Sequence, residues 1–259
     1  MIEAQSWSFS ALSTLATCER KWHMRYRAGL EEEPTSAQAL GTALHAAMQA
    51  WWDHRSVPAA EAALDQALEA GHIDPGQHAD ACWLIGRYAR YHLTGPLRDF
   101  RVVEQEADLE GTLAGVRIRG RVDAVLEGKD RLWVVERKTG KSWPEALKTP
   151  ISAQPGIYLA LARERWGPDV GLINEHVRTY RWIRDEHKHP PHDSVYVAFE
   201  PFDASLVQRA EAWIRLVLER AQDAVEGQRA TVPVLNPWVC RSCPYQEQCL
   251  DADLEEVEL

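Results

Sequence analysis

The sequence predicts an α/β fold in which helices flank a central mixed β-sheet. Apolar residues recur every three or four positions before residue 95, which is the helical period, and β-branched stretches punctuated by glycine follow Pro96. Helix and strand patterns then alternate after residue 150, as in layered α/β proteins. A chain of 259 residues with 45% hydrophobic composition can bury one large core. We expect a single domain over residues 1–259, with a helical part at 1–95, a β-rich core at 96–200, and a long helix and cysteine-rich segment at 201–259.

Four helices are predicted in the helical part. In the second of them, His45 lies beside an apolar stripe that includes Leu44 and Met48. Small residues around His45, beginning at Gly41, would let this helix approach its neighbours closely. The predicted ranges are Ser8–Ala28, which places Cys18 on a helix, then Ser36–His54, Pro58–Ala70 and Gln77–Leu93.

The β-rich core is predicted to open with a meander of strands that ends in "RLWVVERK". A helix follows at Ile151–Trp166, where Ser152 is available as a cap. Two further strands, "EHVRTYRWIR" and "SVYVAF", come before a long amphipathic helix at Asp203–Glu226.

Composition narrows the class of protein. The formal net charge of -10 argues at first sight against a nucleic-acid partner, but acids that hold divalent cations are neutralised in the loaded site. No apolar run approaches the roughly 18 residues of a membrane span, and no signal peptide is visible, so we expect a cytoplasmic protein without a membrane partner. In a reducing compartment, five cysteines indicate metal binding rather than disulfides.

The most informative segment is a predicted hairpin, "GRVDAVLEGKDRLWVVERKTG". If its turn is a two-residue loop at "KD", paired positions sum to 259 and Asp123 lies opposite Glu136. Because side chains alternate along a strand, Lys138 shares the face of Glu136 while Arg137 points away. The spacing therefore predicts that two acids and a lysine converge on one face of the sheet.

A divalent cation would explain this convergence, because desolvated like charges repel and raise each other's pKa. Mg²⁺ prefers a few carboxylates with water, and a bound ion can activate that water against a phosphodiester. Lys138 would then orient the attacking water or stabilise the transition state. The alternative is two acids at strand edges with Lys138 as an ordinary ion-pair partner.

"GRVDAV" followed by "VVERKTG" resembles the core of the PD-(D/E)XK nucleases, with Asp123, Glu136 and Lys138 on the acid, acid and lysine positions. The resemblance implies a restriction-endonuclease-like core and metal-dependent DNA cleavage with Mg²⁺ or Mn²⁺, the carbonyl of Arg137 being a further ligand. RecB-like members usually carry aspartate where this chain has Glu136, a departure that stays within the superfamily pattern.

Two further segments resemble motifs of the RecB-like branch. Gln154 and Tyr158 lie four residues apart on one helix face and match a Gln-x-x-x-Tyr motif, which implies a place near the active site and the DNA. "GTALHAAMQ" is similar to the helix in which these nucleases place a histidine ligand, here His45, and an imidazole suits Mn²⁺ as well as Mg²⁺. The alternatives are packed side chains with no catalytic role. Glu104 and Glu106 are expected to be solvated.

Cys240, Cys243 and Cys249 form a C-x2-C-x5-C cluster, and Cys18 can supply a fourth thiolate. The spacing resembles the iron-sulfur module of RecB-like helicase-nuclease subunits and CRISPR-associated exonucleases. Four thiolates can hold a 4Fe-4S cluster or structural Zn²⁺, and the resemblance favours iron-sulfur. Closing a loop of roughly two hundred residues would stabilise the fold by about 4 or 5 kcal/mol in the entropic model. Cys82 is expected to be buried as a small hydrophobe.

These features together predict a deoxyribonuclease, and the resemblance implies an exonuclease that acts on single-stranded DNA. The resemblance leaves open DNA repair or recombination, phage DNA processing and CRISPR adaptation, with a helicase or a CRISPR adaptation protein as partner. Basic residues of the first helix are the predicted phosphate contacts, with a solvated helical face as the alternative: Arg20, Lys21, Arg25 and Arg27. One alternative is a DNA-binding or assembly subunit that keeps the fold and cluster but does not cut, and another is a zinc-stabilised structural protein.

Overall fold

The computed structural model describes residues 6–140, 152–179, 195–200, 202–228, 231–234 and 236–249. They form two compact units. The first unit combines the two ends of the chain, residues 1–33 and 208–259, with residues 110–120. The second unit consists of residues 34–109 and 121–207. The single-domain assignment and its internal boundaries stay a prediction.

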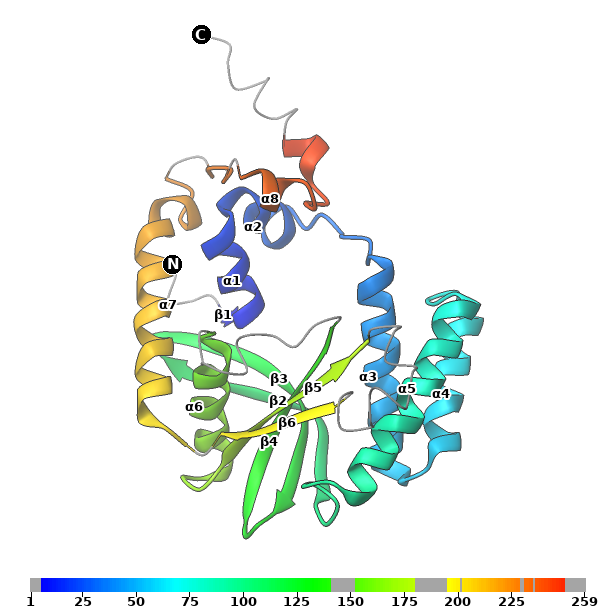
Figure 1. Cartoon of the computed structure of the whole chain (residues 1–259). Coiled ribbons are helices and arrows are strands. Elements are labelled where there is room, and N and C mark those ends of the chain that lie inside the picture. The colour runs from blue at the N-terminus through cyan, green and yellow to red at the C-terminus, as the bar shows by residue number, and fades with distance from the viewer. Residues whose placement is uncertain are drawn as a thin grey trace. The chain divides into compact units, whose positions relative to one another are not determined.

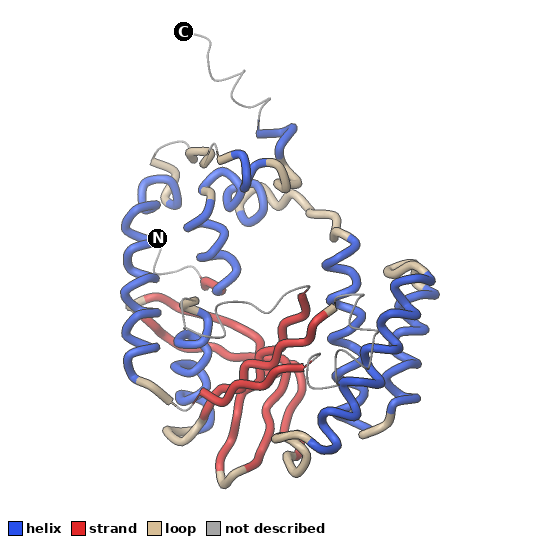
Figure 2. The backbone as a smooth tube through the Cα atoms, in the orientation of Figure 1, coloured by secondary structure: helices blue, strands red, loops and turns tan. Residues whose placement is uncertain are grey.

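A six-stranded mixed sheet confirms the predicted α/β class (Figure 2). Its order is β1-β3-β4-β5-β6, with β2 paired to β3. The β1/β3 and β4/β5 pairs are parallel, whereas the β3/β4 and β5/β6 pairs are antiparallel. The strands are β1 Ser6–Ser8, β2 Arg101–Leu113, β3 Val116–Gly128, β4 Arg131–Gly140, β5 Gly171–Arg178 and β6 Val195–Glu200.

The helices follow the predicted ranges closely except at the N-terminus. The helix at Ser36–His54 has the predicted bounds, and a capping box at Thr35 explains where it begins. The helices in the described residues are α1 Phe9–Thr17, α2 Glu19–Tyr26, α3 Ser36–His54, α4 Val57–Glu69, α5 Pro75–Thr94, α6 Gln154–Trp166, α7 Ala204–Val225 and α8 Pro237–Cys240.

The core of the second unit lies between one face of the sheet and the helices α3, α4 and α5, which lie side by side in Figure 1. Val135 on β4 and Ile173 on β5 belong to this core, as do Trp51 and Tyr88 from the helices. The small residue Gly41 lets α3 approach β4, since an added Cβ there would lie 3.2 Å from Thr139 Oγ1. This packing fixes the helix that carries His45.

Helix α6 packs against β4 and β5 through the other face of the sheet. Alternation along β4 turns Val135 and Arg137 toward the α3–α5 core, and therefore Glu136 and Lys138 toward the α6 face. The first turn of α6 has Ala153 as its N-cap, and the Gln154 N–H donates to the Ser152 hydroxyl at 3.2 Å.

Contacts within and between the two terminal segments hold the first unit together. Within the N-terminal segment, Trp7 on β1 stacks on Trp22 of α2 with ring centroids 5.8 Å apart. The Arg27 guanidinium donates to the Val225 carbonyl at 2.7 Å, and the Tyr245 hydroxyl donates to the Leu30 carbonyl at 2.9 Å. The segments on either side of the β-rich core are therefore packed together.

Two predictions about the elements are corrected, and one short strand was missed. The single helix predicted at Ser8–Ala28 is two helices, because Cys18 has an extended backbone with φ of -159° and ends α1 while capping α2. The strand predicted to begin at Glu175 begins at Gly171, since the apolar run before Glu175 pairs with β4. Strand β1 was not predicted from its three residues.

The segments "DEHKHPPHDS" and "DADLEEVEL" lie outside the described residues. Among the helices that are described, none combines the length and apolar character needed to cross a membrane.

Candidate active site

The β3/β4 hairpin has the predicted register. The residue numbers of each pair in the register, from Ala124 with Val135 to Gly128 with Arg131, sum to 259. Both turn residues are left-handed, with φ of 53° at Lys129 and 60° at Asp130, as a type I′ turn requires. One step further along this register, Asp123 faces Glu136.

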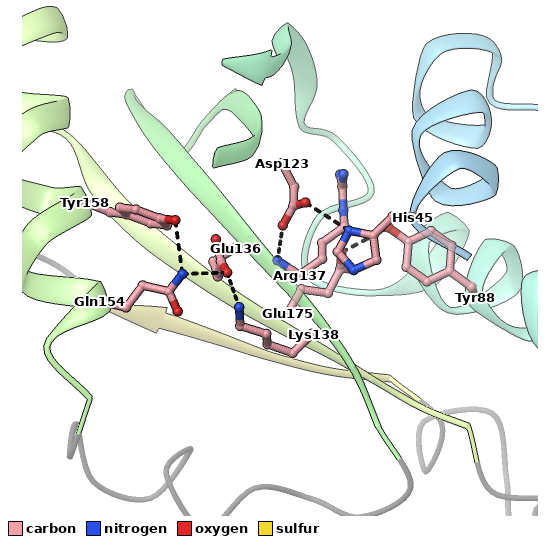
Figure 3. Close-up of polar contacts among 9 residues, drawn as sticks. All are labelled: His45, Tyr88, Asp123, Glu136, Arg137, Lys138, Gln154, Tyr158 and Glu175. Atoms are coloured by element: carbon pink, nitrogen blue, oxygen red, sulfur yellow. Dashed lines mark hydrogen bonds and ion pairs between the residues drawn. The ribbon is translucent and has the colours of Figure 1, made fainter. Parts of the chain in front are cut away.

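Asp123 is held from two directions (Figure 3). The His45 ring places Nδ1 2.9 Å from Asp123 Oδ1, and the backbone N–H of Arg137 donates to Oδ2 at 2.5 Å. Burial raises the pKa of Asp123, but the nearby His45 and the N–H of Arg137 outweigh it, so the pKa lies below its ordinary value. Asp123 therefore stays ionised and can act as a ligand for a cation.

Glu136 is the more buried carboxylate, 8% exposed. Its Oε1 accepts from the Lys138 ammonium and, at 3.0 Å, from the Gln154 side-chain amide. The same amide nitrogen lies 3.0 Å from the Tyr158 hydroxyl. Burial, reinforced by the charge of Asp123 and opposed by Lys138, raises the pKa of Glu136 above its ordinary value.

All six side chains predicted to form the active site therefore meet in the second unit. His45 comes from α3, Asp123 from β3, and Gln154 with Tyr158 from α6. Glu136 and Lys138 come from β4. The structure shows this convergence, whereas the catalytic and metal-binding roles of the residues stay predictions.

The donor set at this site fits a divalent cation, because one imidazole and two carboxylates lie close together (Figure 3). The backbone carbonyl of Arg137 stays a predicted further ligand. Within the described ranges, no three His, Cys, Asp or Glu side chains are already arranged to hold an ion. His45 and Asp123 contact each other and Glu136 contacts Lys138. An incoming ion would replace these side-chain contacts with its own.

Sequence reasoning missed a buried polar chain behind the site (Figure 3). The Arg137 side chain is 2% exposed, and its Nε donates to Glu175 Oε2 at 2.9 Å. The Tyr88 hydroxyl donates to the same oxygen at 3.0 Å, and His92 Nε2 lies 2.6 Å from Glu175 Oε1. Although burial alone would raise it, contacts with His92, Arg137 and Tyr88 lower the pKa of Glu175 to about 2. The sequence contained one indication of these buried contacts: side-chain alternation along the strand predicted that Arg137 points away from the face of Glu136 and Lys138.

Glu104 and Glu106 on β2, which were expected to be solvated, differ in their surroundings. Glu104 forms an ion pair with Arg165 at 2.8 Å. Glu106 has a left-handed backbone, φ 48°, which is uncommon in a strand and indicates a local irregularity. Burial and the charge of Asp123 raise the pKa of Glu106, so its carboxylate is electrostatically coupled to the site.

The four cysteines predicted to bind metal line one pocket of about 260 Å³ in the first unit. Cys18 enters from the break between α1 and α2, where its Sγ accepts the Lys21 N–H at 3.5 Å. The other three predicted ligands follow in order: Cys240 ends α8, Cys243 lies just after it, and Cys249 lies in the helical segment 246–249. Their sulfurs are not gathered around a common point in the part of the chain that the structure describes. The pocket brings the predicted ligand set together without showing a metal.

The predicted phosphate contacts on α2 are only partly available. Arg20 is 8% exposed, and its Nε donates to the Thr231 carbonyl at 3.2 Å, so it joins the chain ends. Lys21 and Arg25 both form ion pairs with Glu32, at 3.3 Å and 2.6 Å. The Arg25 side chain is 43% exposed and remains in contact with solvent.

The model of the PD-(D/E)XK nuclease superfamily matches residues 6–250. The chain therefore belongs to this superfamily, and it is a nuclease by family. No curated protein matched the sequence.

Among solved structures, the chain is similar to a protein of Eubacterium rectale named a "putative exonuclease", with a TM-score of 0.57 and 12% identity. The match covers 88% of this chain and 84% of that one, and at this identity it supports the fold alone. A second structure, named SSO0001, has a TM-score of 0.34 at 17% identity over 91% and 92% of the two chains, which is too low to compare folds.

Proposed function

We propose that this nuclease is a divalent-metal-dependent deoxyribonuclease of the RecB-like branch that hydrolyses phosphodiester bonds. The observation that carries the proposal is the convergence of Asp123, Glu136 and Lys138 on one face of the β3/β4 hairpin, with His45 against Asp123. Gln154 and Tyr158 support the RecB-like assignment, because they join the same cluster at the positions of the motif.

His45, Asp123, Glu136 and the carbonyl of Arg137 would hold Mg²⁺ or Mn²⁺. When bound, such an ion polarises the phosphate and lowers the pKa of a bound water. The Arg137 N–H and the His45 ring fix the orientation of Asp123. In this proposal Lys138, whose ammonium lies at Glu136, positions the water and stabilises charge that develops on the phosphate oxygens.

Gln154 is a positioning residue in this mechanism. Its side-chain amide contacts both Glu136 and the Tyr158 hydroxyl, so α6 fixes the carboxylate through a neutral group. Burial, with the charges of Glu136 and Asp123, raises the pKa of Tyr158, which keeps this hydroxyl protonated and able to donate a hydrogen bond to DNA.

Single-stranded DNA cut from an end is the proposed substrate, with Lys21 and Arg25 as phosphate contacts. Arg20 is left out of this set because its guanidinium is committed to Thr231. Repair or recombination, phage DNA processing and CRISPR adaptation are the proposed settings, with a helicase or CRISPR adaptation protein as partner.

We infer that the cysteine pocket binds a 4Fe-4S cluster. Four cysteines line one cavity otherwise surrounded by largely apolar groups such as Met24 and Pro233, and the Lys21 N–H already donates to a sulfur. Such hydrogen bonds stabilise metal-bound thiolates. Brown protein with about four iron atoms per chain is expected, whereas colourless protein containing zinc would replace this assignment with a structural Zn²⁺ site.

Asp123→Asn tests the proposed chemistry. With Mn²⁺ and end-labelled single-stranded DNA, we expect the cleavage rate to fall by about a thousandfold or more, because an ionised ligand is replaced by a neutral one. Asp108→Asn is the matched control, since Asp108 is an exposed acid on β2 paired with Arg121. Cleavage by pure, folded Asp123→Asn at the wild-type rate would overturn the assignment.

Linear and circular single strands, compared with duplex DNA, test the substrate and end preference. Preference for linear single strands is expected. A wild-type protein that binds DNA but cuts none of these substrates with either metal would favour the non-cutting subunit.

A further inference from the structure

A continuous chain of buried polar contacts runs from helix α3 to strand β4. The Trp52 indole N–H donates to the Tyr88 hydroxyl at 2.7 Å, and Tyr88 donates to Glu175 at 3.0 Å. Glu175 also accepts from Arg137 at 2.9 Å and contacts His92 at 2.6 Å. Every one of these residues is 2% exposed or less. The chain thus connects α3, α5, β5 and β4 inside the core.

The end of this chain is the peptide segment that organises the candidate site. Arg137 stands between Glu136 and Lys138, and it pairs directly with Glu175 in the parallel β4/β5 register. While its side chain is fixed on the core face, its backbone N–H donates to Asp123 at 2.5 Å. Its backbone carbonyl is a proposed metal ligand. Side-chain contacts on one face of the sheet therefore fix backbone groups that serve the other face.

Helix α3 contributes to both faces of this arrangement. Trp52 begins the buried chain, and His45 on the same helix contacts Asp123 at 2.9 Å. A displacement of α3 relative to β4 would therefore change both contacts of Asp123, the one with the His45 ring and the one with the Arg137 N–H. The two routes to Asp123, through His45 and through Arg137, are consequently tied to the same packed core.

Stability does not explain why the core contains these groups. Taking a carboxylate and a guanidinium out of water costs several kcal/mol for each ion, and well-packed apolar side chains of similar volume are often equally stabilising. A buried ion pair does fix relative positions, because it tolerates little displacement without leaving an unpaired charge. Glu175 is 1% exposed, and Arg137, Tyr88 and His92 all contact its carboxylate.

We propose that Tyr88, His92 and Glu175 are positioning residues for the nuclease site: they hold the Arg137 segment so that Asp123 and the Arg137 carbonyl are preorganised for the divalent cation. The inference rests on the proposed function, since it concerns the same metal site. These residues do not touch the cation or the DNA; they act through Arg137. Outer partners of metal ligands typically change metal affinity by about 10- to 100-fold when removed.

Tyr88→Phe is the mildest test, because it removes one hydroxyl and keeps the ring in the core. The matched control is Tyr91→Phe on the same helix, whose hydroxyl makes no hydrogen bond to Glu175 within the described residues. Mn²⁺ affinity is measured by calorimetry without DNA, alongside amide hydrogen exchange of peptides covering residues 131–140. We expect a Kd about tenfold weaker and faster exchange in β4 for Tyr88→Phe, with neither change in Tyr91→Phe.

Glu175→Gln gives a second, larger step that keeps the size of the side chain. A graded loss of Mn²⁺ affinity from wild type through Tyr88→Phe to Glu175→Gln, partly recovered in nuclease assays by excess Mn²⁺, supports positioning. The inference would be overturned if the variants fold with lower thermal stability but keep the wild-type Mn²⁺ affinity and the wild-type amide exchange in β4. The buried polar contacts would then have a purely structural role. If the wild-type protein itself binds no Mn²⁺, the proposed metal-dependent function is wrong. That outcome is distinct from a failure of the positioning role, in which the wild type binds Mn²⁺ and the variants bind it equally well.

Discussion

The acid-lysine site and the cysteine pocket both assemble candidate ligands, but in opposite ways. At the acid-lysine site each acid already has a protein partner: Asp123 contacts His45, and Glu136 contacts Lys138. In the cysteine pocket, four cysteines instead line a cavity of about 260 Å³. The first arrangement is held by a sheet and needs no ion to keep its shape. In the second, an ion or cluster would join segments from the two chain ends.

This difference predicts that changes at the first site alter chemistry and changes at the second alter stability. A site whose groups are held by strands and a buried network should survive the loss of one catalytic side chain. A pocket lined from both ends of the chain should lose a cross-link when one thiol is removed. Each prediction below could break that division.

Of the three substitutions that compare the two sites, Lys138→Met should have the largest effect on activity. The Lys138 side chain is 55% exposed, and Glu136 keeps its hydrogen bond from Gln154 when Lys138 is replaced. Loss of its charge beside the reacting phosphate should lower kcat by about 10²- to 10³-fold. Lys129→Met, at the turn of the same hairpin, is the control and should retain activity. The measurement pairs single-turnover cleavage with thermal unfolding; a large fall in Tm with normal kcat would reverse the role given to this lysine.

Cys243→Ser should act on stability. Losing one of four thiolates should remove the iron, and with it a cross-link worth about 4 or 5 kcal/mol in the entropic model. Iron analysis and denaturant unfolding of protein purified without oxygen measure the two effects. An unchanged iron content and an unchanged unfolding curve would show that Cys243 contributes nothing to a cluster.

The same contrast explains how much could be predicted from the sequence. A two-residue turn fixes the register of a hairpin, so the facing of Asp123 and Glu136 followed from counting residues. The break at Cys18 did not follow, because a thiol is not among the usual helix caps and the apolar spacing continues through it. The Arg137–Glu175 contact depends on a parallel pairing between distant strands, which periodicity does not specify.

The Arg137–Glu175 contact also predicts a pH dependence of stability. Glu175 has its folded pKa lowered from 4.5 to about 2, so its contribution is fully present above pH 4.5 and is lost as the pH falls toward 2. The stability difference between wild type and Glu175→Gln should be on the order of a few kcal/mol at pH 7 and should shrink between pH 4.5 and 3. Urea unfolding at several pH values measures it. A difference that is constant across this range would mean that Glu175 is not ionised in the folded protein.

Cys82→Ala should have the smallest effect and sharpens the comparison between the cysteines. Cys82 lies on α5 in the second unit, half-buried, with its Sγ 3.6 Å from His78 Nε2. Burial and the charges of Glu61 and Asp65 raise the pKa of the Cys82 thiol. Metal binding requires the thiolate, and a raised pKa disfavours that form. Cys82 is therefore a poor metal ligand.

We therefore expect Cys82→Ala to keep the full iron content and to change the unfolding free energy by about 1 kcal/mol or less, the scale of a small half-buried side chain. Iron analysis beside Cys243→Ser measures the contrast. A loss of iron in Cys82→Ala would mean that thiol number, and not the surroundings of each thiol, decides where the metal binds. That outcome would remove the physical basis for assigning the cluster to the pocket at the chain ends.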